Sequence, residues 1–156
     1  MMRELLYVYA LRFTGQATPV GSVGHVLTVA TTAPSSSLTA TVGSNGLVGC
    51  VHAVDGDRAR FASEVTFTSE TSFQEIGTIS FGEGNILRFS TVGSGYLNAS
   101  ADPARTHGTV MWRVDGGDGQ FAGATGLITS NFFVSKNLEI TDHHFGVLFL
   151  PQAGRG

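Results

Sequence analysis

The chain has 156 residues and a formal net charge of −3, a length that fits one domain over residues 1–156 and a charge that gives no electrostatic reason to bind nucleic acid. Its 21 glycines follow no three-residue period, which excludes collagen and predicts many tight turns. It has one cysteine, no apolar run as long as a membrane span and no signal-peptide pattern in its first 15 residues, so we expect a cytoplasmic protein that does not enter membranes.

Alternation of apolar and other residues recurs along the chain, whereas the spacing of an amphipathic helix is almost absent. A first strand is expected at residues 5–13. Residues 33–41, APSSSLTAT, are the one low-complexity stretch and predict a long surface loop or, alternatively, a lid over a cavity. Further strands are expected at residues 23–30, 47–54, 58–69, 73–81, 86–92, 96–97, 108–114, 127–134 and 138–150.

The alternation is clearest at residues 58–69, where Phe61, Ser63 and Val65 share one face that we expect to be buried. The turn 82–84 predicts a hairpin between its flanking strands. Eight to ten strands at a spacing of about 8 to 14 residues predict an all-β sandwich or barrel. Because a series of hairpins leaves two open edges unless the sheet closes, we expect a closed antiparallel barrel of about eight strands, with room for side chains or one small ligand.

The densest glycine signal is DGGDGQFAGATG at residues 115–126. It contains G-x-G-x-x-A, but a dinucleotide fingerprint must open a helix, and Gly123 and Gly126 would break that helix. A glycine-rich corner between two strands, with Phe121 packing inward, is the structural interpretation.

The run from Gly116 to Gly126, GGDGQFAGATG, resembles the G-G-[ST]-G-x-[FY]-x-G-x-x-G signature of the allene oxide cyclase and dirigent superfamily, with Asp118 in place of the usual Ser or Thr. The resemblance covers about residues 80–151. It implies a calycin-like, allene oxide cyclase type of barrel, an oligomer, and relatives that cyclise epoxide fatty acids, guide radical coupling or catalyse cycloadditions. The acidic catalytic residue of the cyclases has no counterpart in residues 5–41.

Asp142-His143-His144 is the one adjacent cluster of titratable groups with an obvious chemical use. Neighbouring strand residues point to opposite faces, so only one histidine can face the lumen. We expect His143 to do so, because it shares its face with Phe145, and to act there as a base or hydrogen-bond donor. The alternative is that both are strand-end histidines without a role.

Other candidates supply polar groups or an apolar wall to the lumen. Asn131 and Tyr9 are expected to orient a ligand, although Tyr9 fits core packing as well. Arg88 and Arg113 are candidates too, although each also fits an ordinary solvated outer face. The substrate-binding residues that we expect are Trp112, Phe133, Phe145, Arg88 and Arg113.

The leading hypothesis is a small-molecule cyclase or isomerase that folds an apolar, flexible substrate inside the barrel. A non-catalytic, lipocalin-like carrier and a filled structural barrel are the alternatives. The histidines show no metal-ligand spacing, so we expect neither a metal nor a cofactor. Apolar residues on both faces of several strands predict a homo-oligomer, a dimer or a trimer.

Overall fold

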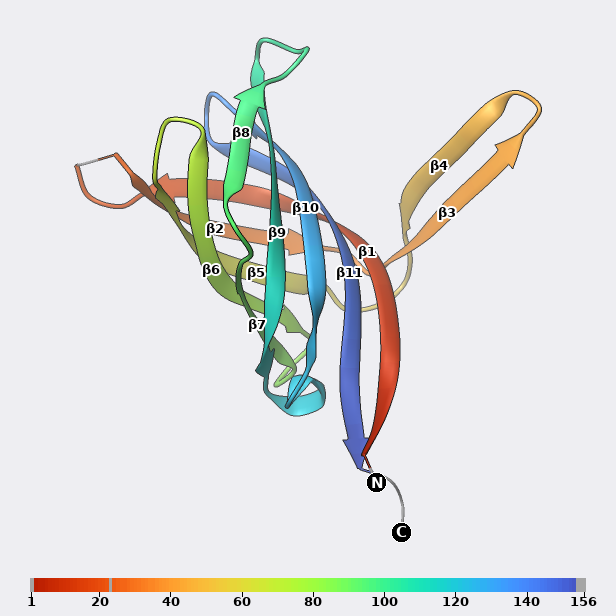
Figure 1. The fold of residues 1–156 in the computed structure, drawn as a ribbon. Helices are drawn as coiled ribbons and strands as arrows, with labels where there is room; N and C mark the ends of the chain where they lie inside the picture. The colour runs from red at the N-terminus through yellow and green to blue at the C-terminus, as the bar shows by residue number, and fades with distance from the viewer. Residues whose placement is uncertain (1, 23, 154–156) are drawn as a thin grey trace.

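The computed structural model describes residues 2–22 and 24–153, and nearly all of its regular structure is β-strand (Figure 1). No helix in this part of the chain is long and apolar enough to span a bilayer. The elements are β1 (Met2–Pro19), β2 (Val26–Ala33), β3 (Ser36–Gly43), β4 (Gly46–Ala53), β5 (Ala59–Phe67), β6 (Ser72–Phe81), β7 (Ile86–Thr91), β8 (Gly95–Ala99), β9 (Arg105–Gly117), the 3₁₀ turn η1 (Gly119–Phe121), β10 (Thr125–Ser135) and β11 (Glu139–Ala153).

Eight strands close into an antiparallel ring. The order is β10-β11-β1-β2-β5-β6-β7-β9, and β9 pairs with β10 to complete the circle. The short β8 lies beyond the end of β7 and pairs with the same two neighbours, β6 and β9. The expected closed antiparallel barrel of about eight strands is therefore confirmed, as is the hairpin of β6 and β7.

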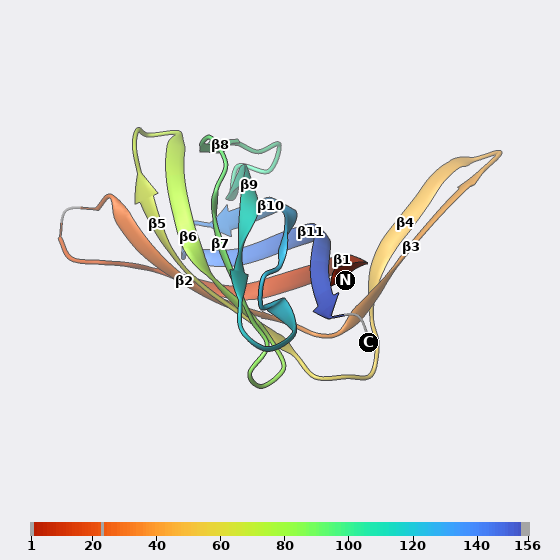
Figure 2. The same cartoon turned by 60° about the horizontal axis from the view of Figure 1, so that its bottom comes forward.

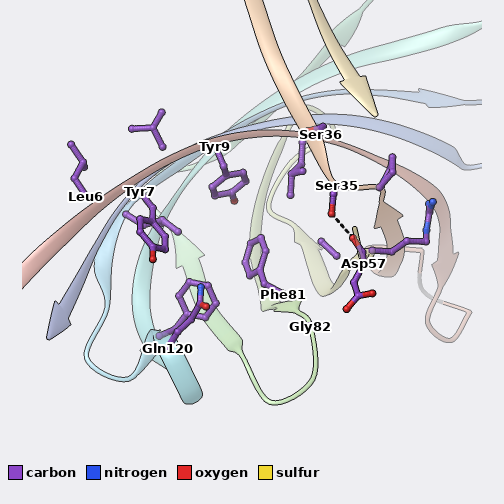
Figure 3. A pocket seen from close by; sticks show the side chains of 16 residues that line it. Leu6, Tyr7, Tyr9, Ser35, Ser36, Asp57, Phe81, Gly82 and Gln120 are labelled. Atoms are coloured by element: carbon purple, nitrogen blue, oxygen red, sulfur yellow. Dashed lines mark hydrogen bonds between the residues drawn. The ribbon is translucent and has the colours of Figure 1, made fainter. Parts of the chain in front are cut away.

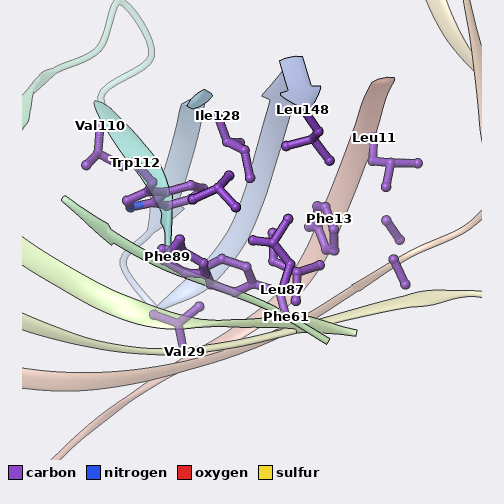
Figure 4. Packing of buried hydrophobic residues seen from close by; sticks show 14 of the residues in the cluster. Leu11, Phe13, Val29, Phe61, Leu87, Phe89, Val110, Trp112, Ile128 and Leu148 are labelled. Atoms are coloured by element: carbon purple, nitrogen blue, oxygen red, sulfur yellow. The ribbon is translucent and has the colours of Figure 1, made fainter. Parts of the chain in front are cut away.

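Alternation along each strand decides what lies inside the barrel. In β5 the burial pattern alternates strictly, and Phe61, Ser63 and Val65 are buried as expected. Large inward side chains from separate strands fill the middle of the barrel (Figure 4). Phe61 stacks on Phe89 with ring centroids 5.3 Å apart, and Phe89 lies 4.5 Å from Trp112. The barrel is thus closed by side chains at its middle and has open space towards both ends.

The glycine corner joins β9 to β10 through one 3₁₀ turn, and Phe121 is buried there as expected. Gly119 has a φ of 61°, and a Cβ at this position would lie 2.6 Å from the carbonyl oxygen of Gly84. Only glycine fits such a backbone at this approach distance.

The expectation of a loop at residues 33–41 is wrong. Most of this segment is β3, which pairs with β4 in a separate two-stranded sheet that stands away from the barrel (Figures 1 and 2). We call β3 and β4 together the arm. The serines and the proline of this stretch suggested a loop, but Thr39, Thr41 and Val42 favour extended backbone.

Candidate functional site in the barrel

A cavity of about 290 Å³ opens at the end of the barrel where β8 lies, and we call it the upper cavity. Most of its wall is apolar and comes from β2, β5, β6, β8, β10 and β11. Two carboxyl groups, those of Glu75 on β6 and Asp142 on β11, also line it, and both residues are buried. The apolar lining residues are Leu27, Val29, Phe61, Val65, Phe67, Phe73, Leu97, Phe132, Val134, Leu138 and Ile140.

Glu75 is held by two neighbouring strands. The Ser63 hydroxyl donates a 2.7 Å hydrogen bond to its Oε1, and its backbone N–H donates to the Thr91 hydroxyl at 2.7 Å. Burial raises the pKa of Glu75 to about 8; the hydrogen bond from Ser63 lowers it in part, the charge of Asp142 raises it further, and the indole of Trp112 lowers it slightly. Glu75 is therefore protonated at neutral pH.

Asp142 accepts hydrogen bonds at both of its carboxylate oxygens. The Ser130 hydroxyl donates to Oδ1 at 2.6 Å, and His144 Nε2 lies 2.8 Å from Oδ2 and donates to it. The His144 ring is enclosed by aromatic side chains, with Phe13 at 4.3 Å and Trp112 at 5.0 Å between ring centroids. This packing fixes the ring, and the ring in turn fixes the carboxylate.

Several buried polar atoms around this cluster have no hydrogen-bond partner among the described residues. They are the hydroxyls of Tyr9 and Thr31, the Trp112 Nε1 and the His144 Nδ1. Buried polar atoms in proteins nearly always have a partner, so an ordered water is expected beside these atoms; none of the four residues lines the upper cavity.

A second space, about 650 Å³, lies at the opposite end and is more open (Figure 3). We call it the lower groove. Tyr9 and Phe81 line it with rings 5.6 Å apart, and the Tyr9 ring covers Gly146, where any Cβ would collide with it. Burial, and to a lesser extent the charge of Asp142, raises the pKa of Tyr9, so its hydroxyl stays neutral.

Trp112 and Tyr9 point into the barrel, but Trp112 is packed in its filled middle and lines neither cavity, and Tyr9 lines the lower groove and not the upper cavity. The predicted orientation of His143 is wrong, because His143 is exposed and His144 points inward. Asn131 is exposed as well, so it does not reach the lumen. On β11 the even-numbered side chains point inward. Its phenylalanines, Phe145 and Phe149, are therefore on the outer face of the barrel.

The remaining candidates also lie outside the barrel, contrary to expectation. Phe133 stacks on His107 at 4.9 Å, and Phe145 is exposed. Arg88 pairs with Asp118 at 2.7 Å, and Arg113 pairs with Asp115 at 3.1 Å. Both pairs are solvated, which is the alternative interpretation of the arginines.

Sequence reasoning missed Glu75, Ser130 and the inward role of Asp142. A signal for Glu75 was present, because it is in phase with Phe73 and Ile79 on a strand whose apolar residues mark the buried face. Among residues 2–22 and 24–153, no group of three His, Cys, Asp or Glu side chains is arranged to hold a metal ion.

Comparison with known proteins supports the fold. No family model matches the chain, and no curated protein matches it in sequence. Among solved structures, a pterocarpan synthase dirigent protein is similar, with a TM-score of 0.52 and 15% sequence identity over all of this chain and 90% of the other. The chain therefore folds as a dirigent-like β-barrel.

Proposed function

We propose that the protein is a cyclase or isomerase that binds a small, mostly apolar and flexible molecule in the upper cavity and acts on it by proton transfer. The observation that carries this proposal is the pair of buried carboxyl groups, Glu75 and Asp142, in one apolar cavity. Two carboxyl groups with unlike surroundings can divide the roles of acid and base between them.

Glu75 is the proton donor. With a pKa of about 8 it carries its proton at neutral pH, and the Ser63 hydroxyl keeps the carboxyl in one orientation. Asp142 is the proton acceptor, and Ser130 and His144 are positioning residues that hold its two oxygens. Neither of these two lines the cavity, so they act through Asp142.

The proposed step balances without any other reactant. Glu75 gives its proton to the substrate, and a carbon–hydrogen or oxygen–hydrogen bond of the substrate gives its proton to Asp142. After product release, Asp142 loses this proton to solvent and Glu75 takes one up from solvent. The product has the composition of the substrate, which defines an isomerisation or an intramolecular cyclisation.

The cavity wall supplies orientation. Phe73 packs edge to face on both Phe67 and Phe132, with ring centroids 6.1 and 5.9 Å apart, and all three rings line the cavity. A closely fitting apolar wall excludes water and holds a flexible chain in one folded shape, which can contribute about 7–11 kcal/mol to lowering a barrier. The volume of about 290 Å³ lies at the small end of ligand pockets and limits the substrate to a compact molecule.

The similar solved structure also supports a role in small-molecule chemistry, since that protein is described as a pterocarpan synthase. Its barrel shows that this architecture can serve such a reaction.

The test is to incubate the protein in D₂O with a small-molecule extract of the cells that make it, and to follow products by mass spectrometry. We expect one compound to be converted into an isomer that carries one added deuterium in place of hydrogen. Glu75→Gln and Asp142→Asn should each lower the rate at least about 100-fold, in line with the usual contribution of an acid or base. Glu64→Gln, a change at an exposed glutamate of the neighbouring β5, should leave the rate unchanged.

The carrier hypothesis makes a different prediction for the same experiment. A compound that binds equally to the wild type and to Glu75→Gln, and is recovered unchanged from both, would show a carrier and refute the enzyme. Absence of any bound or converted compound would favour a purely structural barrel.

A further inference from the structure

Half of one barrel strand has a free edge. β1 pairs with β11 from Met2 to Gln16, but it pairs with β2 only from Thr14 to Pro19. Along residues 5–12, no strand of the described chain pairs with the other edge. Leu6 and Val8 on this stretch are 59% and 57% exposed, and they border the lower groove from the outer face of the strand. A free, apolar strand edge is a template for pairing with another strand.

The arm is a second surface without a partner. Its outer end carries Val42 and Leu47, which are 83% and 73% exposed and lie opposite each other. Residues 36–53 contain no Asp, Glu, Lys or Arg, the residues that normally protect an exposed edge. A two-stranded hairpin is marginally stable by itself in water, so this arm needs a surface to cover it.

The arm and the free edge match in register. The β1–β2 pairing runs from Pro19 opposite Leu27 to Thr14 opposite Thr32. The same register continued into β3 sets Ser36 opposite Ala10, and Leu38 opposite Val8. The Ser36 hydroxyl already donates a hydrogen bond to the Ala10 carbonyl, which shows that this carbonyl points towards the free edge. Because backbone groups alternate along a strand, those of Val8 and Leu6 point the same way and are available for pairing.

The side-chain faces match as well. In the continued register, the outward Leu38 lies beside the outward Val8, which is itself paired with Val147 of β11. On the opposite face, Thr39 lies beside Tyr7. An apolar strip forms on the outside, and hydroxyls lie on the side of the lower groove.

In this structure the arm does not follow its own β1 but leaves the barrel (Figures 1 and 2). Contacts at its base join the chain segments that lead into and out of it. The Val54 N–H donates to the Ser35 carbonyl at 2.8 Å, and the Ser35 hydroxyl donates to the Asp57 carbonyl at 2.6 Å. The arm is therefore presented outward, to a surface that its own barrel does not offer.

From these observations we propose that two copies of the chain exchange arms, so that β3 of each copy pairs with the free edge of β1 in the other. In a dimer the exchange is reciprocal about a two-fold axis, so both arms and both edges are used and the assembly is closed. The exchanged arm covers the lower groove of its partner, so that this end of each barrel is completed only in the dimer. The proposal does not depend on the enzymatic function.

Disulfide trapping tests the register and the exchange together. In a Cys50→Ser background, Val8→Cys and Leu38→Cys are made in separate chains and mixed under mild oxidation. Residues opposite each other in a ladder are about 5.5 Å apart at Cα, within the range that a disulfide bridges. We expect a disulfide-linked dimer from the mixture. A mixture of Leu38→Cys with Ile76→Cys, an exposed site on β6, should give none.

A different result would overturn the exchange. If a single chain with both cysteines forms an internal disulfide while the mixture of single variants gives no cross-link, the arm closes on its own barrel. If neither sample cross-links, the register is wrong.

Light scattering on the full chain gives an independent readout. The wild type should be a dimer, and Val42→Glu combined with Leu47→Glu should give a folded monomer by circular dichroism, because in the continued register residue 42 lies opposite Glu4 and like charges across a ladder repel. Ile76→Glu, an equally drastic change on another exposed face, should stay dimeric. A wild type that is monomeric at every concentration would overturn the proposal.

Discussion

The inner and outer faces of β10 and β11 carry similar residue types in very different surroundings. On the outer face, Asn131 and His143 are cross-strand partners, and both are exposed. On the inner face, one residue along each strand, Ser130 and His144 are cross-strand partners, and both are buried around Asp142. A shift of one residue along a strand exchanges the two faces. What a polar side chain on these two strands can do chemically thus depends on its burial and hydrogen bonding more than on its residue type.

The largest effect that would test this difference is the loss of the inner histidine. His144→Ala should lower the free energy of unfolding by about 3–5 kcal/mol, because it leaves a cavity among aromatic rings and removes a hydrogen bond from a buried carboxylate. Urea unfolding followed by circular dichroism measures it. His144→Phe, which restores the ring without the hydrogen bond, should recover part of the loss. A loss below about 1 kcal/mol for His144→Ala would contradict the assigned packing.

A second test concerns Glu75, the other inward titratable group. Its pKa is raised from 4.5 to about 8 on folding, so the folded protein binds more protons than the unfolded chain between these pH values. The stability associated with Glu75 is therefore present at low pH and is lost as the pH rises through about 8. Glu75→Gln cannot ionise, so at pH 9 it should be more stable than the wild type by about 2–4 kcal/mol.

Urea midpoints at pH 5, 7 and 9 measure this effect. Glu64→Gln on the solvated face of β5 is the control and should follow the wild type at all three values. A stability difference between Glu75→Gln and the wild type that does not change with pH would mean that Glu75 titrates as an ordinary solvated carboxyl.

The smallest expected effect is on the outer face. His143→Ala should change the free energy of unfolding by no more than about 0.5 kcal/mol, since exposed side chains without special contacts contribute little. The same urea experiment measures it, beside His144→Ala. If the two variants lose equal stability, the two faces do not differ as the structure indicates.

Much of the barrel was predictable because its cause is local. Alternation in β5 and the turn at residues 82–84 depend on neighbours along the chain, and both predictions were confirmed. Phe121 as the anchor of the glycine corner was equally local. Which face of β11 points into the barrel could not be predicted locally, because both of its faces carry apolar residues. Phe145 and Phe149 made the outer face look like the buried one. In the arm, β4 agrees with the strand expected at residues 47–54, but β3 was missed because its serines suggested a loop.

The sequence by itself determined that the chain forms paired strands, a glycine-rich corner and a closed barrel, since periodicity, turn residues and the need to cover strand edges are properties of the chain order. Only the tertiary structure decided which side of each strand faces the lumen, and thereby brought Glu75 and Asp142 into one cavity from strands that are not neighbours in the ring. The physical reason is that burial is a property of the assembled sheet: a side chain becomes an interior group only when strands distant in sequence enclose it and remove it from water.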